Sequence, residues 1–423
     1  MDGCTYKAYV NILNEELLPA MGCTEPISVA YAAAIAKNTL KTLPERVEIS
    51  VSGNILKNVK SVIVPNTGGL KGVKAAAAAG IIAGKADKKL QVLEEITDTE
   101  IAQIKTFLKT AEFKVVQAKN GCVFDIGVKL YGGGTDAFVR IEGHHTNVVE
   151  ITRGGEKVFC GCENSGECAL TDRSVLSVRG IAEFIDCVKL EDIEEVISRQ
   201  IEFNSAIAEE GLKNEYGANV GKILLKAFGN DVHNLARATA AAGSDARMNG
   251  CNLPVVIVSG SGNQGMTASL PVVVYAKNMN ADREKLLRAV ALSDLITIHL
   301  KTGIGRLSAY CGAVSAGAGA GAGVCYLYGG GVDEISRTIV NALAVDSGVI
   351  CDGAKSSCAA KISTAVDAGL LGMEMCRNGC GFLSGDGILD SGVEKTIDNV
   401  CDLARNGMRE TDEEIIRLMI KKC

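Results

Sequence analysis

The sequence has no cluster of basic residues, and its 423 residues carry a formal net charge of −6. A protein that binds nucleic acid needs a basic face to neutralise phosphates, so we expect no nucleic-acid partner. The first ten residues, MDGCTYKAYV, also lack the charged and then apolar pattern of a signal peptide. Sixteen cysteines without such a leader indicate a reducing cytoplasm, where they serve as thiols, metal ligands or nucleophiles rather than disulfides.

Long runs of Leu, Ile and Val are absent as well. The longest uncharged stretch, residues 307–332, is rich in Ala and Gly, whereas a membrane span needs larger apolar side chains. We therefore expect a buried helix whose small residues let neighbouring helices approach closely, and no membrane-bound form. The sequence also shows no fixed-period repeat and no lysine motif for a pyridoxal phosphate Schiff base.

Apolar residues make up 47% of the sequence, enough for a globular chain with a sizeable core. Their periodicity predicts helices near the N-terminus and again, one after another, from about residue 174 onward. Between them, β-like stretches with hairpin turns at YGGGTD and TRGGEK predict a mostly antiparallel sheet. The predicted fold class is therefore α+β, with residues 1–44 and 170–423 forming a mainly helical catalytic domain and residues 45–169 forming an inserted α+β domain.

The stretch MGCTEP, residues 21–26, places Cys23 directly before a predicted alanine-rich helix. A thiol at a helix N-terminus faces unpaired N–H groups and the positive end of the helix dipole, and both favour the thiolate. This position predicts that the pKa of Cys23 lies below the roughly 8.5 of a free thiol, which suits a general base or nucleophile. A buried structural cysteine is the alternative interpretation.

Three further cysteines, Cys311, Cys351 and Cys358, lie in turns of Gly, Ala and Ser. Small residues allow the backbone to approach an inorganic cluster closely. Three thiolates would leave the fourth iron of a cubane cluster without a protein ligand, and an open iron is a Lewis acid. The spacing is not the C-x2-C of ferredoxins or zinc ribbons, so buried thiols are the alternative.

Six polar residues are candidates for binding the carboxylate and ammonium groups of a substrate: Asn54, Thr67, His145, Asn263, Gln264 and Arg306. The loop SGSGNQGMT can present amide donors to a carboxylate, although an ordinary turn has the same composition. His145 can orient a carboxylate or shuttle a proton, with a surface histidine as the simpler interpretation. Arg306 can bring a guanidinium group near the same iron as Cys311.

Four other cysteines each keep two interpretations: Cys160, Cys162, Cys168 and Cys423. The first three, in FCGCENSGEC, fit a zinc site or a second cluster, or they are exposed thiols. Cys423 could reach an open iron, or it belongs to a disordered chain end.

Several long motifs point to one family: MGCTEPISVAYAAA, GHHTNVV, SDARM, SGSGNQGMTASLPVVV, RLSAYCGA and ICDGAKSSCAAKIST. They resemble the L-cysteine desulfidase family, which is related to the α-chain of iron–sulfur L-serine dehydratases, and the resemblance covers nearly the whole chain. It implies that Cys311, Cys351 and Cys358 bind an oxygen-sensitive 4Fe-4S cluster with one iron lacking a protein ligand, without pyridoxal phosphate. It also implies that Cys23 accepts the proton during the breakdown of L-cysteine to sulfide, ammonia and pyruvate.

Two other functions stay open at this point. An iron–sulfur L-serine dehydratase would use the same chemistry with water as the leaving group, and a non-catalytic iron–sulfur sensor would bind the cluster without turnover. A sensor needs a partner surface or a DNA-binding element, and the sequence shows neither. The predicted partner is a small amino-acid substrate. The sequence leaves the oligomeric state open, and a homodimer is one arrangement that it allows.

Overall fold

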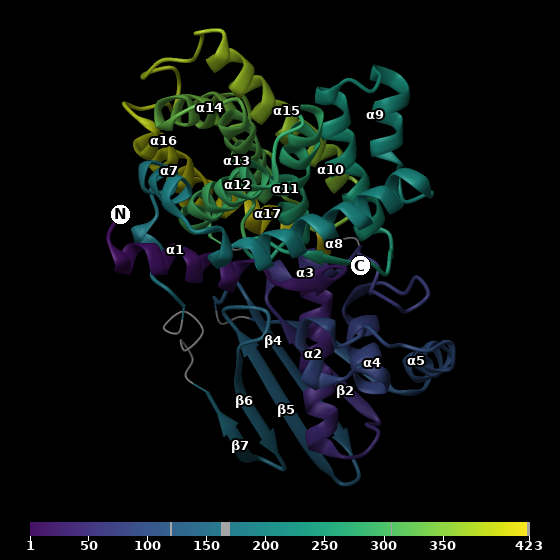
Figure 1. Cartoon of the computed structure of the whole chain (residues 1–423). Coiled ribbons are helices and arrows are strands. Elements are labelled where there is room, and N and C mark those ends of the chain that lie inside the picture. The colour runs from purple at the N-terminus through teal and green to yellow at the C-terminus, as the bar shows by residue number, and fades with distance from the viewer. Residues whose placement is uncertain (119–120, 162–169, 306, 421–423) are drawn as a thin grey trace.

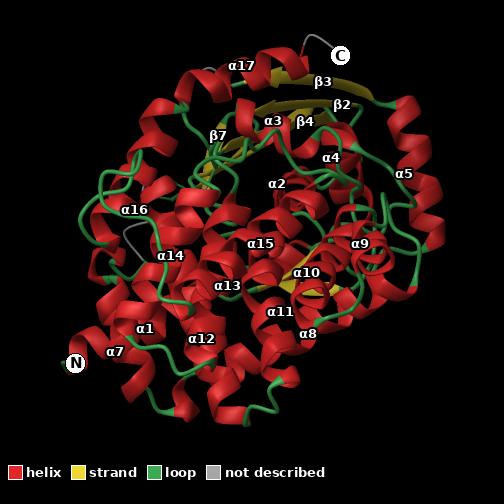
Figure 2. Cartoon of the chain, turned by 90° about the horizontal axis from the view of Figure 1, so that it is seen from above, coloured by secondary structure: helices red, strands yellow, loops and turns green. Residues whose placement is uncertain are grey.

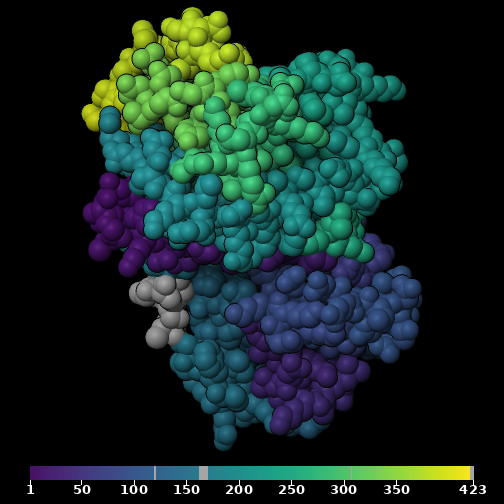
Figure 3. Space-filling model, in the orientation of Figure 1, coloured from purple at the N-terminus to yellow at the C-terminus, as the bar shows by residue number. Residues whose placement is uncertain are grey.

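The computed structural model describes residues 1–118, 121–161, 170–305 and 307–420, which form two layers (Figure 1). One layer consists of packed helices, and the other consists of a sheet with helices packed against it. Figure 3 shows the N-terminal segment, purple at the left edge, at the boundary between the layers. The prediction of an α+β fold that is mainly helical is confirmed.

The sheet orders its six described strands as β3-β2-β4-β5-β6-β7. Their bounds are β2 (Arg46–Val51), β3 (Glu112–Gln117), β4 (Asp125–Gly132), β5 (Thr135–Glu142), β6 (Val148–Arg153) and β7 (Glu156–Cys160). Among these strands only the β2–β3 pair is parallel, so the predicted mostly antiparallel sheet is confirmed. Along β2, Val47, Ile49 and Val51 are buried and alternate with half-buried residues, because successive side chains of a strand point to opposite faces.

The helices of the sheet layer are α2 (Thr24–Leu40), α4 (Gly72–Ala83) and α5 (Asp98–Thr110). A Cβ atom on Gly80 of α4 would lie 2.1 Å from the carbonyl oxygen of Ala30 in α2, so glycine permits the close approach of these two helices. α2 also packs against β4 and β5. The division into a helical domain of residues 1–44 and 170–423 and an inserted domain stays a prediction. In the structure α2, which belongs to residues 1–44, makes its contacts with the sheet layer.

The helical layer is built from α1 (Gly3–Glu16), α7 (Val178–Cys187), α8 (Glu194–Lys213), α9 (Val220–Phe228), α10 (Val232–Met248), α11 (Gly262–Asn278), α12 (Arg283–Ile304), α13 (Gly312–Leu327), α14 (Val332–Val345), α15 (Cys358–Arg377) and α16 (Val393–Asp402). α13 is buried among α11, α12, α14 and α15, which confirms the expected small-residue helix. A Cβ atom on Gly317 would lie 2.1 Å from the carbonyl oxygen of Ala365 in α15. None of the helices in the described ranges has both the length and the apolar character that a membrane crossing requires.

Three contacts join segments that are far apart in the sequence near the boundary of the layers. β1 (Pro19–Met21) pairs with β8 (Pro254–Val256), and Thr24 Oγ1 donates to the carbonyl oxygen of Gly260 (2.9 Å), so the start of α2 lies beside the loop before α11. α17 (Arg409–Ile420) packs against α3 (Gly53–Val59), and Figure 2 shows α17 over the sheet edge. This boundary therefore collects residues that are far apart in the sequence.

Candidate active site

A cavity of about 110 Å³ lies where the layers meet, and all four cysteines that were predicted as site residues line it. They are Cys23, Cys311, Cys351 and Cys358, and each comes from a different segment of the chain. We call this space the thiol cavity. The fold thus brings together the four thiols whose convergence the sequence motifs predicted.

Helix starts and a backbone pairing hold three of these thiols in place. Cys311 is the N-cap residue of α13, and Cys358 is the first residue of α15. The N–H of Cys351 donates to the carbonyl oxygen of Ala309 (2.6 Å), and the N–H of Cys311 donates to that of Val349 (2.9 Å). These two hydrogen bonds fix the backbones of Cys311 and Cys351 beside each other.

The three thiols also interact electrostatically. A hydrogen bond from the Cys311 thiol lowers the pKa of Cys351 against the effect of burial, and the positive charges of Lys57 and Lys301 lower it further. Burial raises the pKa of the Cys358 thiol. A thiolate beside two more thiols and two cations is the soft donor set that iron–sulfur clusters and zinc select.

Three cysteine thiols are a donor set that suits an iron–sulfur cluster, in which each thiolate binds a different iron. Within the described ranges, no three His, Cys, Asp or Glu side chains are arranged to hold one metal ion. Gly312, Gly353 and Ala354 line the cavity beside the thiols and leave space there. Cys311, Cys351 and Cys358 therefore fit a 4Fe-4S cluster with one iron free of protein ligands.

Cys23 is the N-cap residue of α2 and is 3% exposed. Its thiol donates a hydrogen bond to Glu25 Oε2 (3.1 Å). Burial, and next the negative charge of Glu25, raise the pKa of Cys23 well above its usual value. The predicted low pKa is therefore wrong, because desolvation and a neighbouring carboxylate outweigh the helix N-terminus.

Glu25 is a functional candidate that the sequence analysis missed. Its side chain is buried, and its Oε1 accepts a hydrogen bond from Asn58 Nδ2 (2.9 Å). Burial raises the pKa of Glu25, but the charge of His145, the Cys23 hydrogen bond and the charge of Arg247 outweigh it and lower the pKa. Glu25 is thus an ionised carboxylate beside a neutral thiol. The available signal was an acidic residue two positions after the cysteine in MGCTEP.

Two of the predicted substrate residues, Asn263 and Gln264, line the thiol cavity at the start of α11. Arg247 supports them, because its Nη1 donates to Asn263 Oδ1 (3.1 Å) and its Nε donates to the carbonyl oxygen of Gly22 (2.9 Å). Gln264 Oε1 is buried and has no hydrogen-bond partner within the part of the chain that the structure describes. These amides can therefore hydrogen-bond a carboxylate or an ammonium group in the cavity.

Asn54 lies in a second, larger cavity of about 860 Å³ between the layers. The two cavities share Leu307 and Ser308 in their walls, so they are neighbours. Asn54 does not line the thiol cavity itself.

The other predicted substrate residues are placed differently. Thr67 Oγ1 donates to the carbonyl oxygen of Val64 in its own turn (2.7 Å) and lines neither cavity. His145 is buried and does not line the thiol cavity, but its charge lowers the pKa of Glu25. Arg306 lies outside the described residues.

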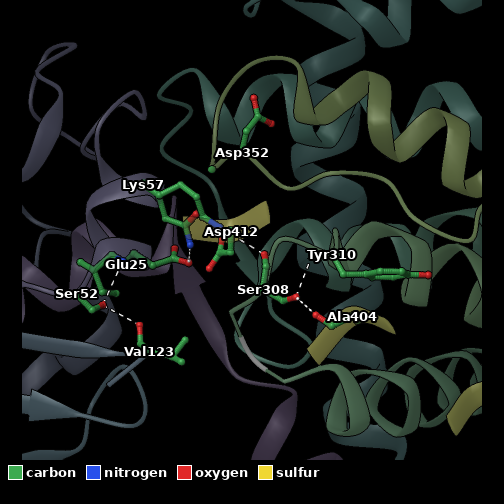
Figure 4. Close-up of polar contacts among 12 residues, drawn as sticks. Glu25, Ser52, Lys57, Val123, Ser308, Tyr310, Asp352, Ala404 and Asp412 are labelled. Atoms are coloured by element: carbon green, nitrogen blue, oxygen red, sulfur yellow. Dashed lines mark hydrogen bonds and ion pairs between the residues drawn. The ribbon is translucent and has the colours of Figure 1, made fainter. Parts of the chain in front are cut away.

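Two buried lysines complete the surroundings, and no sequence pattern indicated a role for either. The Lys57 side chain is 1% exposed, and its Nζ forms an ion pair with Asp412 Oδ1 of α17 (2.6 Å) and donates to the carbonyl oxygen of Ser308 (3.5 Å) (Figure 4). Lys301 lines the thiol cavity. Both therefore supply positive charge close to the thiols.

The cysteines with two interpretations lie elsewhere or are not described. Cys160 ends β7 and is exposed, away from the thiol cavity. Cys162, Cys168 and Cys423 lie outside the described residues, so their interpretations stay predictions.

Residues 87–417 match the family model described as the serine dehydratase alpha chain. The chain belongs to the serine dehydratase alpha chain family. A UPF0597 protein of Desulfitobacterium hafniense (strain Y51) is 55% identical over 419 residues, which cover 99% of this chain and 97% of that relative. A UPF0597 protein of Lachnoclostridium phytofermentans is 49% identical, over 98% of this chain and 100% of that relative. A UPF0597 protein of Treponema denticola is 44% identical, over 100% of this chain and 99% of that relative.

The serine dehydratase alpha chain family confirms the relation that the sequence motifs indicated. It indicates a lyase of the serine dehydratase type, and the family is generally associated with iron–sulfur clusters. The matched range contains Cys311, Cys351 and Cys358, whereas Cys23 precedes it. The family and the donor set of the thiol cavity therefore point to the same kind of chemistry.

Proposed function

We propose that the chain is a 4Fe-4S-dependent lyase that removes the β-substituent of L-cysteine and yields sulfide, ammonia and pyruvate. The observation that carries the proposal is a single cavity lined by Cys23, Cys311, Cys351 and Cys358. Elimination from such an amino acid requires one group that takes the weakly acidic Cα proton and another that assists the departure of the β-substituent.

Cys311, Cys351 and Cys358 would hold the cluster and leave one iron without a protein ligand. When bound, the cluster supplies a Lewis acid that polarises the carboxylate and the β-substituent of the substrate. The chain's contribution is to favour the ligating thiolate form, and Lys57 and Lys301 do so by lowering the pKa of Cys351.

Asn263 and Gln264 would bind and orient the substrate. An amide oxygen accepts from the substrate ammonium, and an amide N–H donates to the carboxylate. Gln264 Oε1 is buried beside the thiols, so it is placed for the first of these contacts. Arg247 holds the Asn263 side chain, which limits the orientations that a bound substrate can take.

Cys23 would take the Cα proton as a thiolate. The electron pair left at Cα then expels the β-substituent, and the aminoacrylate product hydrolyses to pyruvate and ammonia without further help from the protein.

L-Serine is the second candidate substrate, and the match to the serine dehydratase alpha chain favours it. The reaction would be the same with water leaving in place of sulfide. The thiol of L-cysteine is the softer ligand for iron, which is why we place L-cysteine first.

Anaerobic reconstitution of the cluster, followed by separate incubation with L-cysteine and L-serine, tests the proposal. Pyruvate with stoichiometric sulfide from L-cysteine supports a desulfidase, and pyruvate mainly from L-serine supports a dehydratase. An intact, redox-active cluster that yields pyruvate from neither contradicts both and favours a sensor. Cys358→Ser should lose iron, whereas Cys325→Ser, at a buried cysteine of α13 outside the thiol cavity, should retain it.

A further inference from the structure

The hydrogen bonds around Cys23 continue along the wall of the thiol cavity, which Glu25 and Asn58 also line. Cys23 Sγ donates to Glu25 Oε2 (3.1 Å), and Asn58 Nδ2 donates to Glu25 Oε1 (2.9 Å). Glu25 is only 9% exposed, and a buried carboxylate costs free energy unless its surroundings compensate its charge. The structure therefore maintains a negative charge directly beside the thiol.

His145 is buried and does not line the thiol cavity. Against the effect of burial, the charge of His145 is the largest influence that favours the ionised form of Glu25, and Arg247 acts in the same direction. The His145 ring packs edge-on against Phe124, with 4.9 Å between the ring centroids. Both Phe124 and the adjacent His144 line the larger cavity. His145 thus stabilises the Glu25 carboxylate that accepts the hydrogen bond of Cys23.

A thiol cannot accept a proton until it has lost its own. Burial and Glu25 keep Cys23 in the neutral thiol form, so the proposed function requires an acceptor for the thiol proton. Glu25 is a carboxylate within hydrogen-bonding distance of Cys23 Sγ, and it already accepts that hydrogen bond. Geometry therefore identifies the first acceptor.

We infer that Glu25 accepts the proton of Cys23 and returns it to the leaving group, an inference that rests on the proposed function. The S–H bond of Cys23 breaks as an O–H bond forms on Glu25. The Cys23 thiolate then takes the Cα proton, and its S–H bond forms again. The electron pair of the Cα–H bond expels hydrosulfide or hydroxide, which takes the proton from Glu25, because Glu25 lines the same cavity. No oxidant or reductant takes part.

Three variants test this role. Glu25→Gln keeps the size of the side chain and can still accept a hydrogen bond, but it cannot take a proton. Glu25→Asp keeps a carboxylate. Glu142→Gln is the matched control, because Cys122 Sγ donates to Glu142 Oε1 (2.9 Å) in a second cysteine–glutamate pair that does not line the thiol cavity.

In the cluster-loaded enzyme, we expect Glu25→Gln to lower kcat by about 100-fold or more, the usual contribution of a group that transfers protons. KM and the absorption spectrum of the cluster should stay unchanged, because Gln has the size of Glu and the proposed substrate and cluster ligands are the same. Glu25→Asp should recover part of kcat, and Glu142→Gln should have the kcat of the wild type.

A second readout uses the cluster-free protein and measures alkylation of individual cysteines by chloroacetamide with mass spectrometry. Removing the Glu25 charge lowers the pKa of Cys23. Chloroacetamide should therefore alkylate Cys23 faster in Glu25→Gln than in the wild type at neutral pH. Glu142 raises the pKa of Cys122 to about 11, so Glu142→Gln should show the same acceleration at Cys122. Faster alkylation together with slower turnover is not expected of a merely structural role.

A Glu25→Gln enzyme with an intact cluster and the kcat of the wild type would overturn the inference and leave the proposed function standing. An unchanged alkylation rate of Cys23 in Glu25→Gln would also overturn it, since Glu25 would then not act on the thiol. If the wild type with an intact cluster makes no pyruvate from either amino acid, the proposed function fails and the role of Glu25 fails with it.

Discussion

At the scale of single residues, the surroundings of a cysteine determine what it can do. Cys325 in α13 is buried, which raises its pKa to about 11, and it does not line the thiol cavity. Cys23 is buried to a similar extent, but it bonds to Glu25 and lines the cavity. The two residues therefore share their burial and differ in their access to substrate.

Cys23→Ala should reduce turnover by about 100-fold or more, because it removes the group that takes the Cα proton. The cluster spectrum should stay intact, because Cys23 is not one of the three proposed ligands. Pyruvate formation and iron content measure the two effects, and Cys325→Ala should change neither. Wild-type turnover in Cys23→Ala would show that another group is the base.

Asp294 in α12 is a buried carboxylate outside the site. Its Oδ1 accepts from Gln200 Nε2 (2.9 Å), and its Oδ2 has no hydrogen-bond partner within the described ranges. Burial raises the pKa of Asp294 to about 8. Between about pH 4 and pH 8 the folded chain thus holds a proton that the unfolded chain has released, so this group makes the fold less stable as the pH rises.

Asp294→Asn removes this titration. We expect the unfolding free energy of the cluster-free variant to fall less than that of the wild type between about pH 7 and pH 8, by at most about 1.4 kcal/mol. Urea unfolding at several pH values measures the difference. Asp346→Asn is the control, because burial raises the pKa of Asp346 only to about 6. Equal pH dependence in Asp294→Asn and the wild type would contradict the assignment.

At the scale of elements, α13 and α15 determine where two of the thiols lie. Cys311 and Cys358 are at the N-termini of these helices. The helices approach each other most closely through glycines, and a Cβ atom on Gly317 would lie 2.1 Å from the carbonyl oxygen of Ala365. The spacing of the helix pair is thus linked to the spacing of the proposed ligands.

Gly317→Ala should force the two helices apart. We expect a loss of about 1–3 kcal/mol in unfolding free energy from overpacking, and a lower iron content after reconstitution. Gly348→Ala is the control, since a Cβ atom there meets nothing within 4 Å. A folded Gly317→Ala protein with full iron content would show that this contact does not set the ligand spacing.

The Lys57–Asp412 ion pair ties α17 to α3. Asp412→Asn would leave the Lys57 amine buried without its charged partner, at a cost of about 3–5 kcal/mol unless α17 detaches. Urea unfolding measures the loss of stability, and hydrogen exchange along α17 detects detachment. Glu413→Gln on the same helix should change neither, because its ion pair with Arg409 is exposed. No change in either measurement for Asp412→Asn would contradict this account.

At the scale of the whole molecule, the site exists because two layers meet. Cys23 and Glu25 come from α2 of the sheet layer, whereas Cys311 and Cys358 come from helices of the other layer. A change in how the layers pack would separate the proposed base from the proposed ligands. The substrate would therefore be enclosed between the two layers rather than on one of them.

Local patterns allowed much of this arrangement to be predicted. The alternation in β2 and the small residues of α13 are visible in short stretches, and long motifs marked the four cysteines. The raised pKa of Cys23 could not be predicted, because it depends on burial, a property of the packed chain. The Lys57–Asp412 contact spans 355 residues, so no local pattern reports it.

The most direct test of the central claim is a Mössbauer spectrum of protein reconstituted anaerobically with ⁵⁷Fe, recorded with and without L-cysteine or L-serine. Our account predicts about four irons per chain, one of which is distinct and changes when the amino acid is added. Equivalent irons that do not respond to either amino acid, or a mononuclear metal in place of a cluster, would contradict it.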